Sequence, residues 1–197
     1  NEAKKYDRDG RKLILVGHNG HQEVKGTMGQ SEMSLIDDRE PYQMPDWDKN
    51  TPITVLTQTT LSVDDTSRVI DDIETQFDDV LVRNDLCYAT TNRQNAVKEI
   101  SEFVDLFLVV GAENSSNCNR LREVAESKGI DSYLINSLKD LNPDWLLNVS
   151  NVGITSGAST PDNLVHEIID YLNPDELIKM GGEEENIVFS LPLEFRE

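Results

Sequence analysis

The sequence is poor in basic residues and in cysteine, and it has no long apolar run. Its 197 residues include 18 lysines and arginines against 37 aspartates and glutamates, a formal net charge of −19. Because sequence-independent binding to nucleic acid or to an anionic membrane needs basic patches, this balance argues against both partners. No stretch approaches the roughly 20 apolar residues of a membrane span, and no charged-then-apolar signal peptide is evident. Two cysteines, Cys87 and Cys118, are too few for a disulfide framework, so we expect a reducing compartment, the cytoplasm or a plastid-like organelle.

Two common nucleotide-binding motifs are also missing. The loop Gly111–Arg120 lacks the Gly-Lys-Ser/Thr ending of a Walker A motif, and it does not follow the Gly-x-Gly-x-x-Gly pattern either. A nucleotide is therefore not the expected ligand.

Short β-branched runs alternate with helical patterns along most of the chain, which predicts an α/β fold with parallel sheets flanked by helices. The expected strands are Lys12–Gly17, Ile53–Thr57, Asp79–Val82, Leu106–Gly111, Ser132–Ile135 and Val152–Thr155. The expected helices are Val63–Phe77, Thr90–Val104, Asn117–Lys128, Asp144–Val149 and Pro161–Leu172.

The pattern divides into two similar α/β domains, residues 1–85 and 86–175, with a boundary near Asn84–Leu86. Residues 176–197 form a polar link and a terminal strand, Ile187–Leu191, which we expect to pack back on the body. The acidic segment Ser34–Asn50, which contains two prolines, gives no clear prediction.

Cys87 lies just after an apolar run and just before a helical one. Helix N–H dipoles at such a junction favour the thiolate, which is the form that binds metal. Free cysteine is also among the most buried residue types, so position alone leaves a structural role open. Cys118 follows a run of hydroxyl residues on a first helical turn, where a small residue is needed for packing.

Ligands of open α/β sheets bind outside the carboxyl ends of the strands, so the loops at those ends are the candidate site. His21 and Glu23 follow the first strand and share a side if the stretch is extended, which would join a donor to a proton-carrying carboxylate. A solvated polar loop is the alternative. Thr59 and Thr60 follow the next strand, and Ser62 is expected to cap the helix after it.

Hydroxyl and amide residues follow two later strands, where each opens a helix; they are Ser115, Ser116, Asn117 and Ser159. N–H and hydroxyl donors that converge at a helix start can hold a phosphate, although simple N-capping explains each residue alone. Together the loops indicate a diphosphate-sized anion bound by neutral donors beside a thiolate.

Read in order, these loops resemble the LytB/IspH family of 4-hydroxy-3-methylbut-2-enyl diphosphate reductases. The resemblance rests on the blocks His-x-Glu-Val-x-Gly-Thr-Met-Gly-Gln, from His21, and Cys-Tyr-Ala-Thr-Thr-Asn-Arg-Gln, from Cys87, and on the tail Glu184–Phe189. It implies three α/β domains around a 4Fe-4S iron–sulfur cluster held by three cysteines. It also implies reductive removal of the substrate hydroxyl, giving isopentenyl and dimethylallyl diphosphates, with electrons from ferredoxin or flavodoxin.

The resemblance implies a role for each motif residue. Cys87 would be a cluster ligand. Glu23 would deliver a proton to the leaving hydroxyl, and Thr59 would hold that hydroxyl. The residues implied to bind or line the substrate site are His21, Gln58, Thr60, Ser115, Ser116, Asn117 and Ser159.

The family's other two cluster cysteines belong to a region before residue 1, so the resemblance implies a fragment without the first domain. Asn1–Lys5 resembles the end of the helix that follows the second of those cysteines. One cysteine does not hold a cluster, and the chain alone is therefore expected to be inactive. The alternatives are a non-catalytic module that binds a diphosphate or a protein, and a sugar- or nucleotide-phosphate enzyme without metal.

Overall fold

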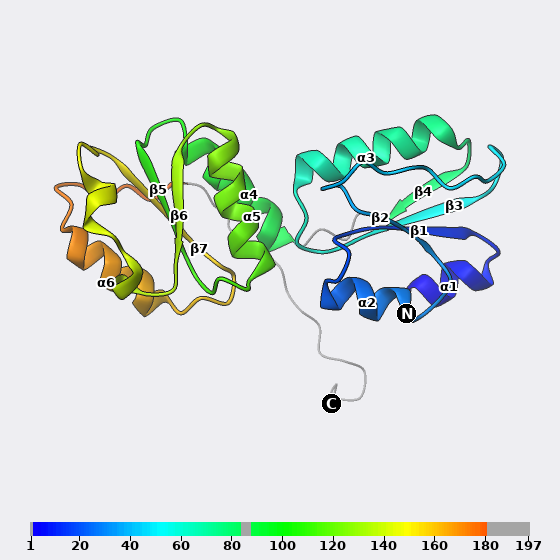
Figure 1. The fold of residues 1–197 in the computed structure, drawn as a ribbon, viewed down its shortest axis with the longest axis horizontal. Helices are drawn as coiled ribbons and strands as arrows, with labels where there is room; N and C mark the ends of the chain where they lie inside the picture. The colour runs from blue at the N-terminus through cyan, green and yellow to red at the C-terminus, as the bar shows by residue number, and fades with distance from the viewer. Residues whose placement is uncertain (1, 84–87, 181–197) are drawn as a thin grey trace, which may run out of the picture.

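The structure is a computed structural model that describes residues 2–83 and 88–180. It has two α/β halves joined end to end (Figure 1). The elements of the first half are α1 (Glu2–Arg8), β1 (Lys12–Val16), α2 (Gln22–Met28), β2 (Ser34–Ile36), β3 (Ile53–Thr57), α3 (Val63–Gln76) and β4 (Val80–Arg83). Those of the second half are α4 (Tyr88–Ile100), β5 (Leu106–Val110), α5 (Ser116–Ser127), β6 (Asp131–Ile135), the 3-10 turns η1 (Leu138–Asp140) and η2 (Pro143–Leu146), β7 (Val152–Ser156) and α6 (Asp162–Leu172).

Each half is built on its own parallel sheet, which confirms the predicted fold class. The strand order is β2-β1-β3-β4 in the first half and β6-β5-β7 in the second. All six predicted strands are present. The predicted boundary near residues 84–86 and the terminal strand at residues 187–191 lie outside the described residues.

The central strands are buried on both faces, as continuous apolar runs in parallel sheets require. In β1, Ile14 and Val16 face the core under α3, whereas Leu13 and Leu15 face the core under α1 and α2. In the second half, alternate residues of β5 pack likewise against α5 on one face and α6 on the other. The sheets thus hold the carboxyl ends of β1, β3, β5 and β7 as fixed platforms for loops.

Two elements were not predicted, and one predicted helix is wrong. Residues 22–28 form α2, where no helix was predicted. β2 was not predicted, because it has only three residues. The helix expected at Asp144–Val149 is wrong: residues 143–146 form a single 3-10 turn that begins with Pro143, and the chain is already extended at Leu147.

One tryptophan belongs to the core of each half. Trp47, in the irregular segment after β2, packs against Phe77 with ring centroids 6.2 Å apart. Trp145 stacks on Tyr133 at 3.8 Å with an interplanar angle of 2°. The acidic segment that gave no prediction therefore covers the first core with aromatic and apolar side chains.

The halves meet at the first turn of α3. Gln94 of α4 is 1% exposed; its Nε2 donates to the carbonyl of Leu61 at 2.8 Å, and its Oε1 accepts the N–H of Val63 at 3.2 Å. Lys98 pairs with Asp64 at 2.7 Å. One buried amide of the second half thus satisfies two backbone groups of the first, including an N–H at a helix start that has no partner within the helix.

None of the helices in residues 2–83 and 88–180 is both long enough and apolar enough to cross a bilayer.

Candidate functional site

Glu23 and Thr59, which follow two neighbouring strands, are joined by two hydrogen bonds. Glu23 lies in the first turn of α2, and Thr59 follows β3. One carboxylate oxygen accepts the backbone N–H of Thr59 at 3.0 Å, and the other accepts its hydroxyl at 3.0 Å. A threonine hydroxyl that donates to a carboxylate still has lone pairs to accept a further hydrogen bond. The pair can therefore pass a proton between Glu23 and a group bound beyond Thr59.

The side chain of Gln58, next to Thr59, is buried rather than exposed to a ligand. It is 1% exposed; its Oε1 accepts the N–H of His18 at 3.0 Å, and its Nε2 donates to Thr60 Oγ1 at 3.0 Å. A Cβ on Gly17 would lie 3.3 Å from Gln58 and 2.7 Å from Val24 Cγ2, so glycine is required there. Gln58 thus holds the loop after β1 and the loop after β3 together.

His21 connects the two halves. It is the N-cap of α2, and its Nε2 lies 2.9 Å from the hydroxyl of Ser116 at the start of α5. Its Nδ1 is buried and has no partner among the described residues. The condition under which His21 and Glu23 would share a side, an extended stretch, is not met: the helix begins between them, and the two side chains contact different loops.

The start of α5 combines capping with unsatisfied donors. Ser115 is the N-cap and accepts the N–H of Cys118 at 3.3 Å, as the capping alternative predicted. Both amide atoms of Asn117 are buried without a partner in the described part of the chain. Ser159 is exposed and lines a hollow of about 220 Å³ with Ser115. Buried polar groups rarely lack partners, so the unpaired amide of Asn117 is unusual at this helix N-terminus.

Cys118 is a packing residue, as expected. It is 1% exposed, and its sulfur lies between Gly111 and Gly157, so that a Cβ on either glycine would overlap it. Two strand-end loops therefore approach each other over one sulfur atom.

We expect Gly157→Ala to lower the free energy of unfolding by about 1–3 kcal/mol, because its new methyl would lie 2.5 Å from Cys118 Sγ and 3.0 Å from Thr160 Oγ1. Adding Cys118→Ala should restore part of the loss. Gly26→Ala is the control: nothing lies within 4 Å of that site in helix α2, so it should stabilise by about 0.5–1 kcal/mol. Urea unfolding measures all three, and equal effects at positions 157 and 26 would contradict the packing assignment.

The described residues do not by themselves fit an iron–sulfur cluster. Cys118 is the one thiol among them, and its sulfur is enclosed by the protein, whereas clusters are held by several thiolates. Cys87, the predicted ligand, lies outside the described residues.

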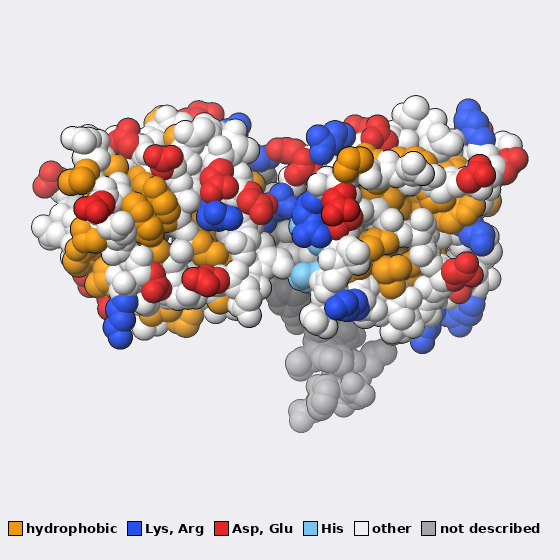
Figure 2. All heavy atoms as spheres, viewed as in Figure 1, with side chains coloured by type: hydrophobic (Ala, Val, Ile, Leu, Met, Phe, Trp, Pro, Cys, Tyr) orange, Lys and Arg blue, Asp and Glu red, His pale blue; other side chains and the backbone are white. Residues whose placement is uncertain are grey.

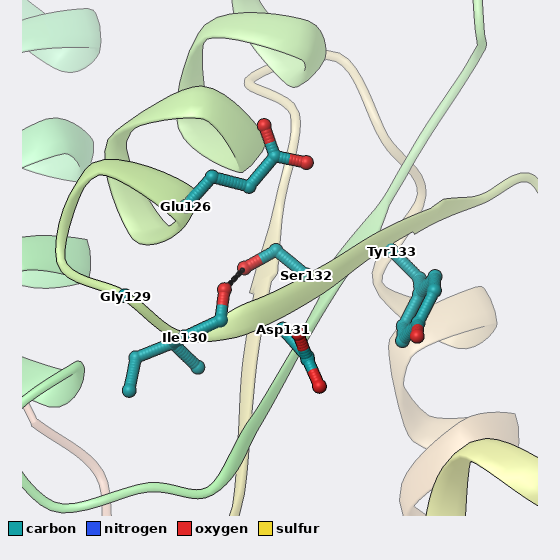
Figure 3. Close-up of a pocket in the computed structure, with 6 residues that line it drawn as sticks. All are labelled: Glu126, Gly129, Ile130, Asp131, Ser132 and Tyr133. Atoms are coloured by element: carbon teal, nitrogen blue, oxygen red, sulfur yellow. Dashed lines mark hydrogen bonds between the residues drawn. The ribbon is translucent and has the colours of Figure 1, made fainter.

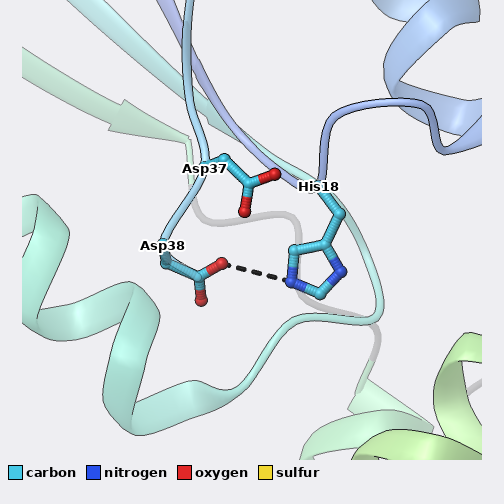
Figure 4. A group of neighbouring side chains, drawn as sticks. All are labelled: His18, Asp37 and Asp38. Carbon is cyan, nitrogen blue, oxygen red and sulfur yellow. Dashed lines mark ion pairs between the residues drawn. The ribbon is translucent and has the colours of Figure 1, made fainter. Parts of the chain in front are cut away.

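Sequence reasoning missed a charged group beside His18. Figure 4 shows His18 after β1 pointing to Asp38, with Asp37 next to it. The His18 Nε2–Asp38 distance is 3.1 Å, and ligand atoms of all three residues lie within 4.8 Å of one another. Arg39 binds both oxygens of Asp37 and holds the pKa of that carboxyl well below its usual range. With a guanidinium already bound there, the group is an ion-pair cluster rather than a cation site. Asp37 and Asp38 follow β2, so predicting that strand would have placed them at the site edge.

A larger hollow, of about 370 Å³, lies away from these loops. Figure 3 shows the residues that line it near the amino end of β6, among them Glu126, Gly129 and Asp131. The candidate residues all follow the carboxyl ends of strands, so this hollow does not belong to their site.

The comparisons with known proteins agree with one another. The 4-hydroxy-3-methylbut-2-enyl diphosphate reductase 2 of Bradyrhizobium diazoefficiens is 46% identical over 98% of this chain and 65% of its own length. The protein named 4-hydroxy-3-methylbut-2-enyl diphosphate reductase in Saccharophagus degradans is 45% identical over 99% of this chain and 66% of its own length. The solved structure of E-1-hydroxy-2-methyl-but-2-enyl-4-diphosphate reductase from Plasmodium falciparum has a TM-score of 0.87 and 28% identity over 98% of this chain and 64% of that chain.

The chain spans about 65% of the length of these curated relatives. The family model described as LytB protein matches residues 1–173, a range that includes all the strands and helices of the described residues. The chain belongs to the LytB family.

Proposed function

We propose that this chain carries the proton-delivering and diphosphate-binding parts of a 4-hydroxy-3-methylbut-2-enyl diphosphate reductase. The reaction removes the substrate hydroxyl as water and gives isopentenyl and dimethylallyl diphosphates, the last step of the non-mevalonate isoprenoid pathway. The observation that supports it most is the Glu23–Thr59 pair, a carboxyl group joined to a hydroxyl through two hydrogen bonds of 3.0 Å.

The two ends of the substrate suit the two halves of the chain. Loss of a hydroxyl needs a proton on the leaving oxygen, and protonated Glu23 supplies it through Thr59 Oγ1. The diphosphate needs several donors, which Ser115, Ser116 and Asn117 offer at the N-terminus of α5 and Ser159 offers after β7. His21, at 2.9 Å from Ser116, lies between the two groups. Gln58 and Thr60 support the loop that carries Thr59.

The reduction itself needs electrons, which an iron–sulfur cluster supplies in the proposed enzyme. Cys87 is the residue of this chain that we propose as a ligand. One thiolate does not hold a 4Fe-4S cluster, so the remaining ligands have to come from residues other than these 197. Ferredoxin or flavodoxin is the proposed electron donor.

The test uses the full-length protein, reconstituted anaerobically with iron and sulfide. We expect broad visible absorbance and, with a chemical reductant, conversion of 4-hydroxy-3-methylbut-2-enyl diphosphate to both products, measured by mass spectrometry. Absence of absorbance and of product would overturn the assignment. Binding of inorganic pyrophosphate without turnover would instead favour the non-catalytic diphosphate-binding module.

A further inference from the structure

We propose that Arg120, acting through His18 and Asp38, is a positioning residue that holds the turn of residues 18–21, just before the proton donor Glu23, against the N-terminal part of α5. This inference rests on the proposed function. Figure 2 shows basic, acidic and histidine side chains gathered where the two halves meet.

Helix α5 contacts a single turn at two points. The turn runs from His18 to His21 and is closed by a hydrogen bond from the N–H of His21 to the carbonyl of His18, at 3.1 Å. Ser116 Oγ lies 2.9 Å from His21 Nε2, and Arg120 Nη2 lies 3.4 Å from His18 Nε2. Ser116 and Arg120 are four residues apart, so both are on one face of the helix. Two contacts on one face restrain both the position and the rotation of α5 against the turn, in addition to the Gln94 and Lys98 contacts at α3.

The contact between Arg120 and His18 involves charged groups and is largely buried. The side chains of Arg120, His18 and Asp38 are 11%, 17% and 3% exposed. Burial disfavours charge on Asp38, but the hydrogen bond and charge of His18, with the charge of Arg120, outweigh it and hold the pKa of Asp38 below its ordinary value. Asp38 is thus a carboxylate, and its Oδ1 lies 3.1 Å from His18 Nε2.

Acidic groups surround the guanidinium of Arg120 on three elements. Its Nη1 lies 3.0 Å from Glu123 on α5 and 3.6 Å from Asp65 on α3, while Asp38 follows β2. Asp37 beside it is already paired with Arg39. Arg120 is therefore the cation that joins carboxylates of the first half to α5, and low exposure strengthens this attraction.

Arg120 belongs to neither the proton-donating pair nor the proposed diphosphate-binding residues. Glu23 and Thr59 both belong to the first half and remain paired without Arg120. Ser115, Asn117 and Ser159 all belong to the second half. Loss of Arg120 therefore alters the distance between the proton donor and the bound diphosphate, but neither group itself.

The experiment compares Arg120→Met with Arg68→Met in the full-length reconstituted protein. Arg68 also pairs with Asp65, at 3.2 Å, but is 64% exposed and does not reach the second half. We expect Arg120→Met to lower kcat about tenfold, because small displacements of reacting groups are costly, and to leave the Kd of inorganic pyrophosphate within about twofold. Arg120→Lys should recover part of kcat. Asp38→Asn should lower kcat about threefold and add less than twofold to Arg120→Met, since both act through His18.

Amide hydrogen exchange gives a readout that needs no turnover. In Arg120→Met, amides of residues 18–23 should exchange faster than in Arg68→Met and in the unmodified protein. A lower melting temperature with unchanged kcat and unchanged exchange would overturn the proposal and leave Arg120 a structural residue. An unmodified protein that lacks turnover would instead refute the proposed function, while the exchange result would still decide the positioning role.

Discussion

Glu23→Gln is expected to lower turnover of the full-length protein by a factor of about 100 or more, while cluster formation and substrate binding remain. Glutamine has the same shape, and its oxygen can still accept the Thr59 N–H. Its NH₂ group, however, would donate to Thr59 Oγ1 where the carboxylate accepts. The pair keeps its geometry and loses its transferable proton, because an amide does not ionise at working pH.

Single-turnover measurement with reduced protein separates this loss from any defect in electron supply. Glu32→Gln is the matched control, since Glu32 is an exposed glutamate shortly after α2. It should change turnover by less than twofold. Undiminished turnover in Glu23→Gln would exclude Glu23 as the essential donor.

Gln94→Met is expected to lower the free energy of unfolding by about 3 kcal/mol. Methionine keeps the length of the side chain but removes both polar atoms, so the buried Leu61 carbonyl and the partly buried Val63 N–H lose their partner. Each unsatisfied buried group costs about 1–3 kcal/mol. No large cavity forms, so the loss reports the hydrogen bonds rather than packing.

Gln76→Met is the control for this substitution. Gln76 ends α3 and is exposed, so its replacement should change stability by less than about 0.5 kcal/mol. Urea unfolding followed by circular dichroism compares the two. Equal midpoints for both variants would show that the Gln94 amide does not stabilise the junction.

The strands were predictable because parallel strands that are buried on both faces consist of continuous apolar runs. Ile53–Thr57, for example, was predicted with the bounds that the structure shows. Element β2 was missed because three residues are too few to show a period. Helix α2 was missed because Gly26 and the polar loop before it resemble a turn. Residues 144–149 contain a helical apolar pattern, but the segment has too few residues to continue beyond one 3-10 turn.

The sequence predicted which residues belong to the candidate site but not which of them contact one another. The spacing pointed to Glu23 and Thr59 separately, but the hydrogen bonds between them depend on two strands that are adjacent only in the folded sheet. Likewise, no local pattern links His21 to Ser116, which are 95 residues apart. Asp38 and Arg120 were missed for the same reason, since their contacts with His18 join residues that are far apart in the sequence.

Each half has its own tryptophan, and this makes the independence of the two halves measurable. Trp47 contacts Phe77, and Trp145 stacks on Tyr133 at 3.8 Å, so loss of either packing alters the fluorescence of one half alone. Trp47→Phe leaves an emission signal from the second half, and Trp145→Phe leaves one from the first. Coincident denaturation curves would mean that the halves unfold as one cooperative unit, whereas two separate midpoints would mean that each half unfolds on its own.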